Sequence, residues 1–200
     1  MKILVAGATG FIGKELLKKL DEKGHEIVVL TRNLETARFH IPIHCEIHQW
    51  DPEKSPLPAN FLKGVDAVVN LSGENIASSF WTETQKRKLM DSRVMSVRRI
   101  AQAIGAMDAK PKVFISASAV GFYGNRKNEE LKETSSAGEG FLSKICQSWE
   151  NEITKSNDLG IRTVIFSSAW FWDMVGVLWK KLYPHLSLDS AGNLEMDLNG

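Results

Sequence analysis

Residues 2–13 are Lys2-Ile3-Leu4-Val5-Ala6-Gly7-Ala8-Thr9-Gly10-Phe11-Ile12-Gly13, an apolar run followed by a glycine-rich turn. The apolar run predicts a buried strand, because it is short and glycines end it. Residues 11–23 predict a helix whose apolar side chains share one face, and Gly24 stands where a glycine commonly ends a helix. Strand, glycine turn and helix in this order are typical of the first unit of a parallel sheet.

The same alternation continues along the chain. Further strands are predicted at residues 26–30, 41–48, 66–71, 112–116 and 161–166, and long helices at 82–104 and 141–153. Thr82 and Gln85 have the form of a capping box at the start of the first long helix. The pattern predicts an α/β fold, a doubly wound parallel sheet with helices on both faces. In such sheets the ligand binds beyond the carboxyl ends of the strands, so functional residues are expected there.

The turn from Gly7 to Gly13 is a candidate site for a dinucleotide. Its glycines follow the spacing G-x-x-G-x-x-G, and glycine lets backbone amides approach a pyrophosphate closely. The helix that follows adds the positive end of its dipole. We therefore expect cofactor contacts from Gly7, Thr9, Gly10, Phe11, Ile12 and Gly13. A tight turn without a ligand is the alternative.

The residue that reads the ribose is expected about 20 residues beyond the glycines, at the end of the second strand. That position holds Arg32, within Thr31-Arg32-Asn33. An acidic residue there would bind the ribose 2′-hydroxyl and repel a 2′-phosphate, whereas a guanidinium can pair with the phosphate. The sequence therefore predicts NADP(H) in preference to NAD(H) as the cofactor. A solvated surface arginine is the alternative.

Residues 41–48 alternate isoleucine and cysteine with polar side chains, which predicts a strand with one buried face. That strand would place His44, Glu46 and His48 together on its more polar face. A metal site at these three residues is one interpretation, and solvated strand residues are the simpler one. We favour the simpler interpretation, so no metal is predicted.

Composition narrows the classes of protein. The chain has 200 residues, and 25 Lys and Arg against 24 Asp and Glu leave a net charge of +1, so no nucleic-acid partner is expected. Two cysteines exclude a disulfide scaffold and fit a reducing cytosol. The most lipid-like stretch, residues 164–179, is shorter than the roughly 20 apolar residues that span a bilayer. We expect a soluble, cytoplasmic protein with a small-molecule substrate.

Several stretches resemble the extended short-chain dehydrogenase/reductase superfamily, and more narrowly its atypical branch of nucleoside-diphosphate-sugar epimerases. They are Gly7 to Gly13, Leu30 to Arg32, Trp50-Asp51-Pro52, Asn70-Leu71-Ser72-Gly73-Glu74-Asn75-Ile76, Asp91-Ser92-Arg93-Val94 and Ser116-Ala117-Ser118-Ala119-Val120-Gly121-Phe122-Tyr123-Gly124. The resemblance implies an NAD(P)-binding Rossmann fold over residues 1–166.

The resemblance also implies roles for residues near the strand ends. Leu71, Ser72 and Gly73 would line the adenosine and pyrophosphate side, Asp51 would lie near the adenine, and Ser116, Ala117 and Ser118 would follow the fifth strand and face the nicotinamide. Arg93 falls where many relatives carry an asparagine. Strand capping and ordinary loop contacts are the alternative for each of these residues.

The catalytic pair of the superfamily is missing. Its members use Tyr-x-x-x-Lys on the helix after the fifth strand, and alignment places Phe141 and Ile145 at those positions. Lys144 is one residue away, about 100° round a helix, and cannot simply replace the lysine. Tyr123 is therefore the candidate acid, with Ser118 at the superfamily's substrate-orienting serine. A buried tyrosine satisfied by the backbone is the alternative.

Residues 167–200 depart from the family pattern. The resemblance fades after Phe166, and a polar tail follows Leu186. An apolar helical face is predicted between them, formed by Phe171, Met174, Val175, Leu178 and Leu182. We interpret residues 167–200 as a divergent helix and tail, the remnant of a substrate-binding lobe in a C-terminally truncated relative. Surface left uncovered without that lobe would favour a homodimer.

Three functions are consistent with these patterns. The first is an NADP-dependent oxidoreductase or epimerase that acts by hydride transfer on a small polar or sugar-like substrate. The second is a non-catalytic protein that binds or senses NADP(H), which the missing Tyr/Lys pair favours. The third is a truncated relative without activity. A fold resemblance alone does not decide among them.

Overall fold

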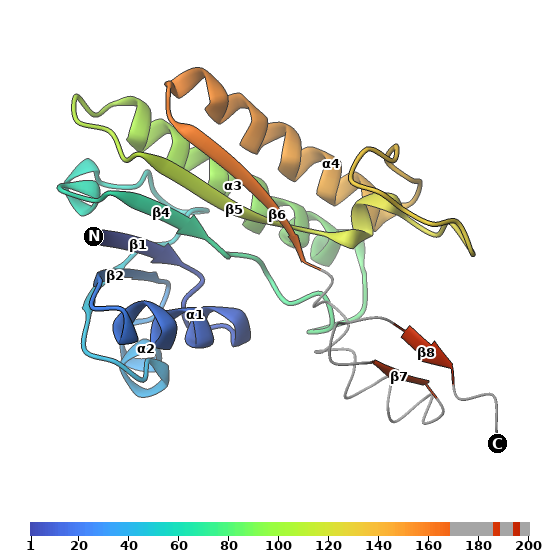
Figure 1. Ribbon diagram of the computed structural model, residues 1–200, viewed down its shortest axis with the longest axis horizontal. Coiled ribbons are helices and arrows are strands. Elements are labelled where there is room, and N and C mark those ends of the chain that lie inside the picture. Colours follow the sequence, from blue (N-terminus) through green and yellow to red (C-terminus); the bar gives the residue numbers. More distant parts are fainter. Residues whose placement is uncertain (169–185, 189–193, 197–200) are drawn as a thin grey trace.

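The computed structural model describes residues 1–168, 186–188 and 194–196. Six parallel strands form one sheet in the order β3-β2-β1-β4-β5-β6 (Figure 1). They are β1 (Lys2–Ala6), β2 (Glu26–Thr31), β3 (Glu46–Gln49), β4 (Ala67–Asn70), β5 (Val113–Ala119) and β6 (Arg162–Ser168). The strand order reverses between β1 and β4, which is the switch point where such sheets bind ligands. The predicted doubly wound α/β sheet is confirmed.

Helices cover both faces of this sheet. α1 (Phe11–Glu22) and α2 (Leu34–His40) lie on one face, and α3 (Glu83–Gly105) and α4 (Phe141–Thr154) lie on the other (Figure 1). The short helices η1 (Ala59–Leu62), η2 (Val120–Tyr123) and η3 (Lys155–Leu159) occupy connections. Thr82 begins α3 as predicted, because its Oγ1 accepts a hydrogen bond from the backbone N–H of Gln85 at 3.2 Å.

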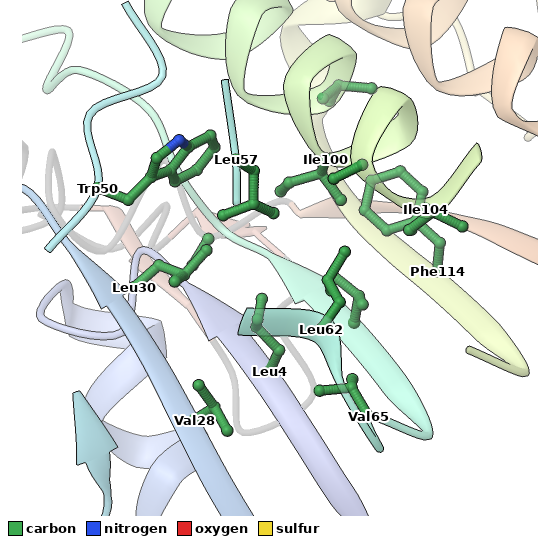
Figure 2. Close-up of a cluster of buried hydrophobic side chains, with 14 of the residues drawn as sticks. Leu4, Val28, Leu30, Trp50, Leu57, Leu62, Val65, Ile100, Ile104 and Phe114 are labelled. Carbon is green, nitrogen blue, oxygen red and sulfur yellow. The ribbon is translucent and has the colours of Figure 1, made fainter. Parts of the chain in front are cut away.

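Alternate residues of the central strands enter two separate cores. In β1, Leu4 belongs to the core under α3 and α4, while Ile3 and Val5 belong to the core under α1 and α2. Successive side chains of a strand point to opposite faces, which explains the division. Figure 2 shows the first core, where Ile100 of α3 and Phe114 of β5 are buried with Leu4. Each fully buried side chain of this kind contributes about 1.5–3 kcal/mol to the stability of the fold, so this core stabilises the central strands.

The segment around residue 40 differs from the prediction. The sequence pattern does not predict α2, which Asn33 begins by accepting a backbone hydrogen bond from the first turn at 3.0 Å. The strand predicted over residues 41–48 is wrong in its first half, because β3 covers only Glu46–Gln49. Ile41 instead closes α2, and its N–H donates to the carbonyl of Ala37 at 2.9 Å. The alternation there reflects a loop that packs one face against the core.

β5 runs past its predicted end. The prediction stops at Ser116, whereas the strand continues to Ala119, because β6 pairs with it as far as Ser168. Ser116, Ala117 and Ser118 therefore lie within the strand and do not follow it. Small residues such as these have weak strand preference of their own, and pairing with β6 overrides that preference.

The C-terminal segment is described only in part. The apolar helix predicted over residues 171–182 lies outside the described residues. The described remainder is an antiparallel pair, β7 (Leu186–Leu188) and β8 (Leu194–Met196), which the sequence pattern does not predict. Among the helices that the structure describes, none has both the length and the apolar character needed to cross a bilayer.

Candidate cofactor site

A cavity of about 310 Å³ lies beyond the carboxyl ends of β1, β2 and β4, where the strand order reverses. The turn after β1, the segments after β2 and β3 and the loop after β4 contribute to its walls. It is lined by Ala6, Gly7, Thr9, Gly10, Leu30, Thr31, Arg32, Asn33, Thr36, Trp50, Pro52, Glu53, Leu71, Ser72, Gly73, Glu74 and Ser92. The structure thus brings together seven residues of the predicted cofactor set from three separate segments, those after β1, β2 and β4.

The glycine turn is shaped by two close backbone approaches. Gly7 has a φ of +80°, and a Cβ there would lie 2.5 Å from the backbone carbon of Leu71. A Cβ on Gly13 would lie 2.5 Å from the carbonyl oxygen of Gly7. α1 begins after Gly10, which offers no side-chain cap, and the first turn of the helix carries no acidic residue. This cradle fits a pyrophosphate, which would meet backbone and the positive helix end without an opposing carboxylate.

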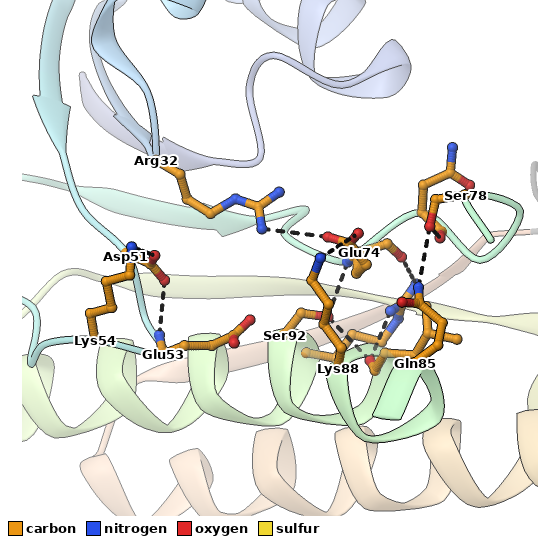
Figure 3. A network of polar contacts seen from close by, with 12 residues as sticks. Arg32, Asp51, Glu53, Lys54, Glu74, Ser78, Gln85, Lys88 and Ser92 are labelled. Atoms are coloured by element: carbon orange, nitrogen blue, oxygen red, sulfur yellow. Dashed lines mark hydrogen bonds and ion pairs between the residues drawn. The ribbon is translucent and has the colours of Figure 1, made fainter. Parts of the chain in front are cut away.

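Three charged side chains meet at one side of the cavity (Figure 3). Arg32 Nη1 lies 3.4 Å from Glu74 Oε2, and Lys88 Nζ lies 3.1 Å from Glu74 Oε1. Arg32 is anchored through its backbone, because its carbonyl accepts a hydrogen bond from Gln49 Nε2 at 3.1 Å. The Arg32 side chain remains 57% exposed, so its guanidinium can reach a ligand in the cavity.

The loop after β4 is held from behind by α3. The backbone N–H of Glu74 donates to Ser92 Oγ at 3.0 Å, and its carbonyl accepts from Arg93 Nη2 at 3.0 Å. Arg93 also donates to the carbonyl of Leu89 at 2.9 Å, and its guanidinium lies against Gly73. Burial lowers the pKa of the Arg93 guanidinium. Arg93 therefore supports the cavity wall and does not line the cavity itself.

Asp51 and three predicted residues of the first helical turn, Phe11, Ile12 and Gly13, lie outside the cavity lining. Asp51 Oδ1 accepts a hydrogen bond from the backbone of Glu53 at 3.1 Å, and its carboxylate pairs with Lys54 at 3.2 Å. Its neighbours Trp50, Pro52 and Glu53 line the cavity. Phe11 and Ile12 are exposed, at 62% and 37%. In the motif around Asp51, the cavity is therefore lined by the neighbours of Asp51 and not by Asp51 itself.

The serines at the end of β5 are engaged within the protein. Asn70 Nδ2 donates to Ser96 Oγ at 3.1 Å and to Ser116 Oγ at 3.4 Å, and all three residues are buried. Ser118 is 3% exposed, and its Oγ donates to the carboxylate of Glu150 on α4. The polar groups of this strand end therefore join the sheet to its helices.

Tyr123 ends η2, just beyond β5, and is half-buried with its ring edge-on to Phe122 at 5.3 Å. Phe141 contacts Trp81 through a ring–ring distance of 5.6 Å. Ile145 is 2% exposed and belongs to the interior. The two positions of the superfamily's Tyr/Lys pair thus hold one aromatic contact and one core residue.

Cys146 lies beneath the same region, on α4. Burial raises the pKa of its thiol to about 11. A thiol with that pKa is almost fully protonated at neutral pH, and the thiolate is the reactive form. Cys146 is therefore a packing residue.

The histidines near β3 do not gather as the predicted strand would place them. His48 Nε2 contacts Glu46 Oε1 at 2.7 Å, and the His48 ring stacks on Phe61 at 4.0 Å. His44 precedes β3 and is exposed. Within the described part of the chain, no group of three or more His, Cys, Asp or Glu side chains is arranged to hold a metal.

Two contributors to the charged group, Glu74 and Lys88, have no role in the sequence-based prediction. Glu74 lies within a quoted motif, but nothing in the sequence pairs it with Arg32, 42 residues earlier. Lys88 and Ser92 are four residues apart on α3, so they share a helix face. That spacing is the one signal that could have linked Lys88 to the loop.

Comparison with known proteins places these features in a family. The model of the NAD dependent epimerase/dehydratase family matches residues 3–167. An epimerase family protein of Mycobacterium bovis is 32% identical over 192 residues, which cover 96% of this chain and 61% of that protein. The epimerase family protein YfhF of Bacillus subtilis is 36% identical over 165 residues, 82% of this chain and 53% of that protein. The chain thus spans about half to three fifths of the length of these relatives.

Solved structures give the same result. The crystal structure of human epimerase family protein SDR39U1 (isoform 2) with NADPH has a TM-score of 0.68 and 27% identity, over 96% of this chain and 64% of that one. A nucleoside-diphosphate sugar epimerase of Corynebacterium glutamicum has a TM-score of 0.67 and 30% identity, over 82% of this chain and 33% of that one. Since the family match runs from β1 to β6 and takes in every wall of the cavity, the chain belongs to the NAD dependent epimerase/dehydratase family.

Proposed function

We propose that the cavity binds NADP(H) in preference to NAD(H). The observation that carries this proposal is the position of Arg32, which follows β2 and lines the same cavity as Gly7 and Gly10. The turn would hold the pyrophosphate against α1, and Arg32 would pair with the 2′-phosphate. Each charge-assisted hydrogen bond to that phosphate contributes about 1.5–3 kcal/mol. The NADPH in the structure of the human relative supports the same assignment.

Calorimetric titration with NADPH and NADH tests the cofactor preference. We expect NADPH to bind about tenfold more tightly or better, since one charge-assisted bond suffices for that ratio. Arg32→Asp should reverse the preference, and Arg32→Lys, which keeps the charge, should retain most of it. An Arg32→Asp variant that still prefers NADPH would contradict the proposal.

Hydride chemistry on a small polar or sugar-like substrate is the activity that we propose for this site. A bound nicotinamide supplies the hydride when it reduces a carbonyl. The carbonyl oxygen then needs a proton, and Tyr123 is the residue beyond β5 that can donate one. Ser118, whose hydroxyl donates to Glu150 in this structure, would turn that hydrogen to the carbonyl oxygen and so orient it. Tyr123 is therefore the proposed proton donor and Ser118 the proposed orienting group.

A non-catalytic role in binding NADP(H) is the second candidate. It is favoured by Phe141 and Ile145, because neither side chain can move a proton. NADPH consumption with a panel of carbonyl compounds separates the two functions. The hydride proposal expects turnover that Tyr123→Phe abolishes, with NADPH affinity unchanged and with Phe122→Leu as the aromatic control. Tight NADPH binding without turnover on any carbonyl would identify the second function.

A further inference from the structure

A carboxylate stands beside the cation that the proposed function assigns to the 2′-phosphate. Glu74 and Arg32 both line the cavity, with 3.4 Å between Glu74 Oε2 and Arg32 Nη1 (Figure 3). The Glu74 side chain is 13% exposed, against 57% for Arg32. A phosphate that approaches Arg32 must therefore enter the field of an enclosed group of its own charge.

Of these two partners, Arg32 is the one that can move. The backbone of Glu74 is bonded on both sides to α3, through Ser92 and Arg93 at 3.0 Å each. Among the residues that the structure describes, the Arg32 side chain has a single polar contact, with Glu74 at 3.4 Å, which is near the upper limit for a hydrogen bond. A ligand can therefore draw the guanidinium away from the carboxylate, while Glu74 stays in the cavity wall.

Lys88 neutralises Glu74 from outside the cavity. Its Nζ lies 3.1 Å from Glu74 Oε1, on the carboxylate oxygen that Arg32 does not contact. Lys88 itself is absent from the cavity lining. When Arg32 turns to a ligand, Lys88 can remain on Glu74 and offset its charge. This second cation matters because a 2′-phosphate carries about −1.5 to −2 charges at pH 7.

We propose that Glu74 sets the ratio between NADP(H) and NAD(H) affinity by competing with the 2′-phosphate for Arg32, and that Lys88 limits this competition. The inference rests on the proposed binding of NADP(H). NAD(H) presents a 2′-hydroxyl in place of the phosphate, and a hydroxyl is neutral and can donate to a carboxylate. Glu74 therefore disfavours only the phosphorylated cofactor. Arg32 favours NADP(H) over NAD(H), and Glu74 makes this preference smaller than it would be without the carboxylate.

The test uses Glu74→Gln, Lys88→Met and the double variant in the full chain. Dissociation constants are measured for NADPH and NADH, and for the fragments 2′,5′-ADP and 5′-ADP, by calorimetry. Glu74→Gln should tighten NADPH binding about fivefold, the upper range for a partly exposed ion pair, and leave NADH within twofold. Lys88→Met should weaken NADPH binding about threefold and leave NADH unchanged.

The double variant separates two roles for Lys88. If Lys88 acts through Glu74, Lys88→Met should have no effect in the Glu74→Gln background. Glu83→Gln is the matched control, because Glu83 pairs with a lysine of α3, as Glu74 does, but does not line the cavity. It removes the same charge and should change NADPH affinity less than twofold.

Several outcomes would overturn the inference. One is an unchanged NADPH/NADH ratio in Glu74→Gln, and another is weaker binding of both nucleotides, which would make Glu74 a ribose ligand or a loop support. A Lys88→Met effect that persists in the double variant would overturn the counter-charge role. If Glu74→Gln loses its far-ultraviolet circular dichroism, that variant does not fold and the test rests on Lys88→Met. An NADPH affinity of Lys88→Met equal to that of the wild type then refutes the inference. Failure of the proposed function looks different, since the wild-type chain would then show no NADPH preference.

Discussion

The parallel sheet ends in two regions that use their polar residues in opposite ways. In the cofactor region, the cavity beyond β1, β2 and β4, polar groups face open space, and Arg32 is 57% exposed. In the β5 region, formed by Ser116, Ser118 and Tyr123, the two serines are 0% and 3% exposed and bonded to other side chains. Polar side chains of the first region thus remain accessible to a ligand, whereas the two serines of the second are bonded within the protein.

The contrast shows that Phe141 and Ile145, at the positions of the resembled superfamily's Tyr/Lys pair, lie outside the cavity that we propose for the nucleotide. Ile145 occupies the place of a lysine in the resembled superfamily, and it is 2% exposed. An apolar side chain there contributes about 1.5–3 kcal/mol of packing, whereas a lysine would bring a charge into the interior. Ile145 thus contributes to the packing of α4 and supplies no proton-transfer group, and it does not line the cavity.

The largest expected effect comes from Gly7→Ala. Gly7 has a left-handed backbone conformation, and a methyl group there would lie 2.5 Å from the backbone of Leu71. We therefore expect the free energy of unfolding to fall by about 3 kcal/mol or more and NADPH binding to be lost. Gly24→Ala is the matched control, because Gly24 has a φ of +70° but nothing within 4 Å. The free energy of unfolding of Gly24→Ala should fall by only about 1–2 kcal/mol, and its NADPH affinity should be unchanged. Urea unfolding and NADPH titration measure both, and equal losses would contradict the role of the close approach.

Asn70→Ala tests whether the two regions are coupled. Asn70 Oδ1 accepts from the backbone of Ser72 in the cofactor region at 3.2 Å, and its Nδ2 donates to Ser116 in the β5 region. Removing a buried amide with several partners should lower stability by about 2–3 kcal/mol and weaken NADPH binding. Ser116→Ala, which removes one partner, should lower stability less and leave binding intact. Unchanged NADPH affinity in Asn70→Ala would show that the regions are independent.

The smallest effect is expected from Glu152→Gln, between α3 and α4. Arg98 donates to both Glu152 oxygens at 3.0 Å, and this holds the pKa of Glu152 below its ordinary value of 4.5. Because the folded-state pKa is lowered, the stabilisation is present above pH 4.5 and is lost as pH falls through the folded value. For a partly exposed pair we expect a loss of about 1 kcal/mol at pH 7, with NADPH affinity unchanged.

Urea unfolding of Glu152→Gln at pH 7 and pH 3.5 measures this contribution. The variant should lose less stability than the wild type on acidification, because the group that titrates is gone. Glu83→Gln is the control, since Glu83 also pairs with a cation, Lys86 on the same helix, but its side chain is 87% exposed. Acid sensitivity equal to that of the wild type would refute the assignment.

Local signals predicted the strands and the helix that surround the cofactor region. The strand, the glycine turn and the helix after it depend on residues within one short segment, and Arg32 follows from its distance along the chain. Pairing partners far apart in sequence decided the β5 region. Ser116 and Ser118 were expected after the strand, but β6, more than 40 residues away, extends the strand through both. No local pattern contains that information.

The same distinction applies to the charged group in the cavity. Glu74 comes to Arg32 only because the loop after β4 crosses beside the end of β2 in three dimensions. α2 was missed for the opposite reason: only its cap, Asn33, carries a strong local signal, and the isoleucines after it imitate a strand. Hydrophobic periodicity does not identify a short helix when its only local signal is one capping residue and the segment after it alternates like a strand.

The central place of β1 has a consequence for synthesis of the chain. β1 leaves the ribosome before both of its neighbours, because it pairs on one side with β2 from residue 26 and on the other with β4 from residue 67. At roughly 5–20 residues per second, several seconds pass before that second neighbour is translated. During that interval a nascent chain exposes one unpaired apolar edge. Chaperone contact and cotranslational aggregation should therefore concentrate on residues 2–70, the segment from β1 to β4.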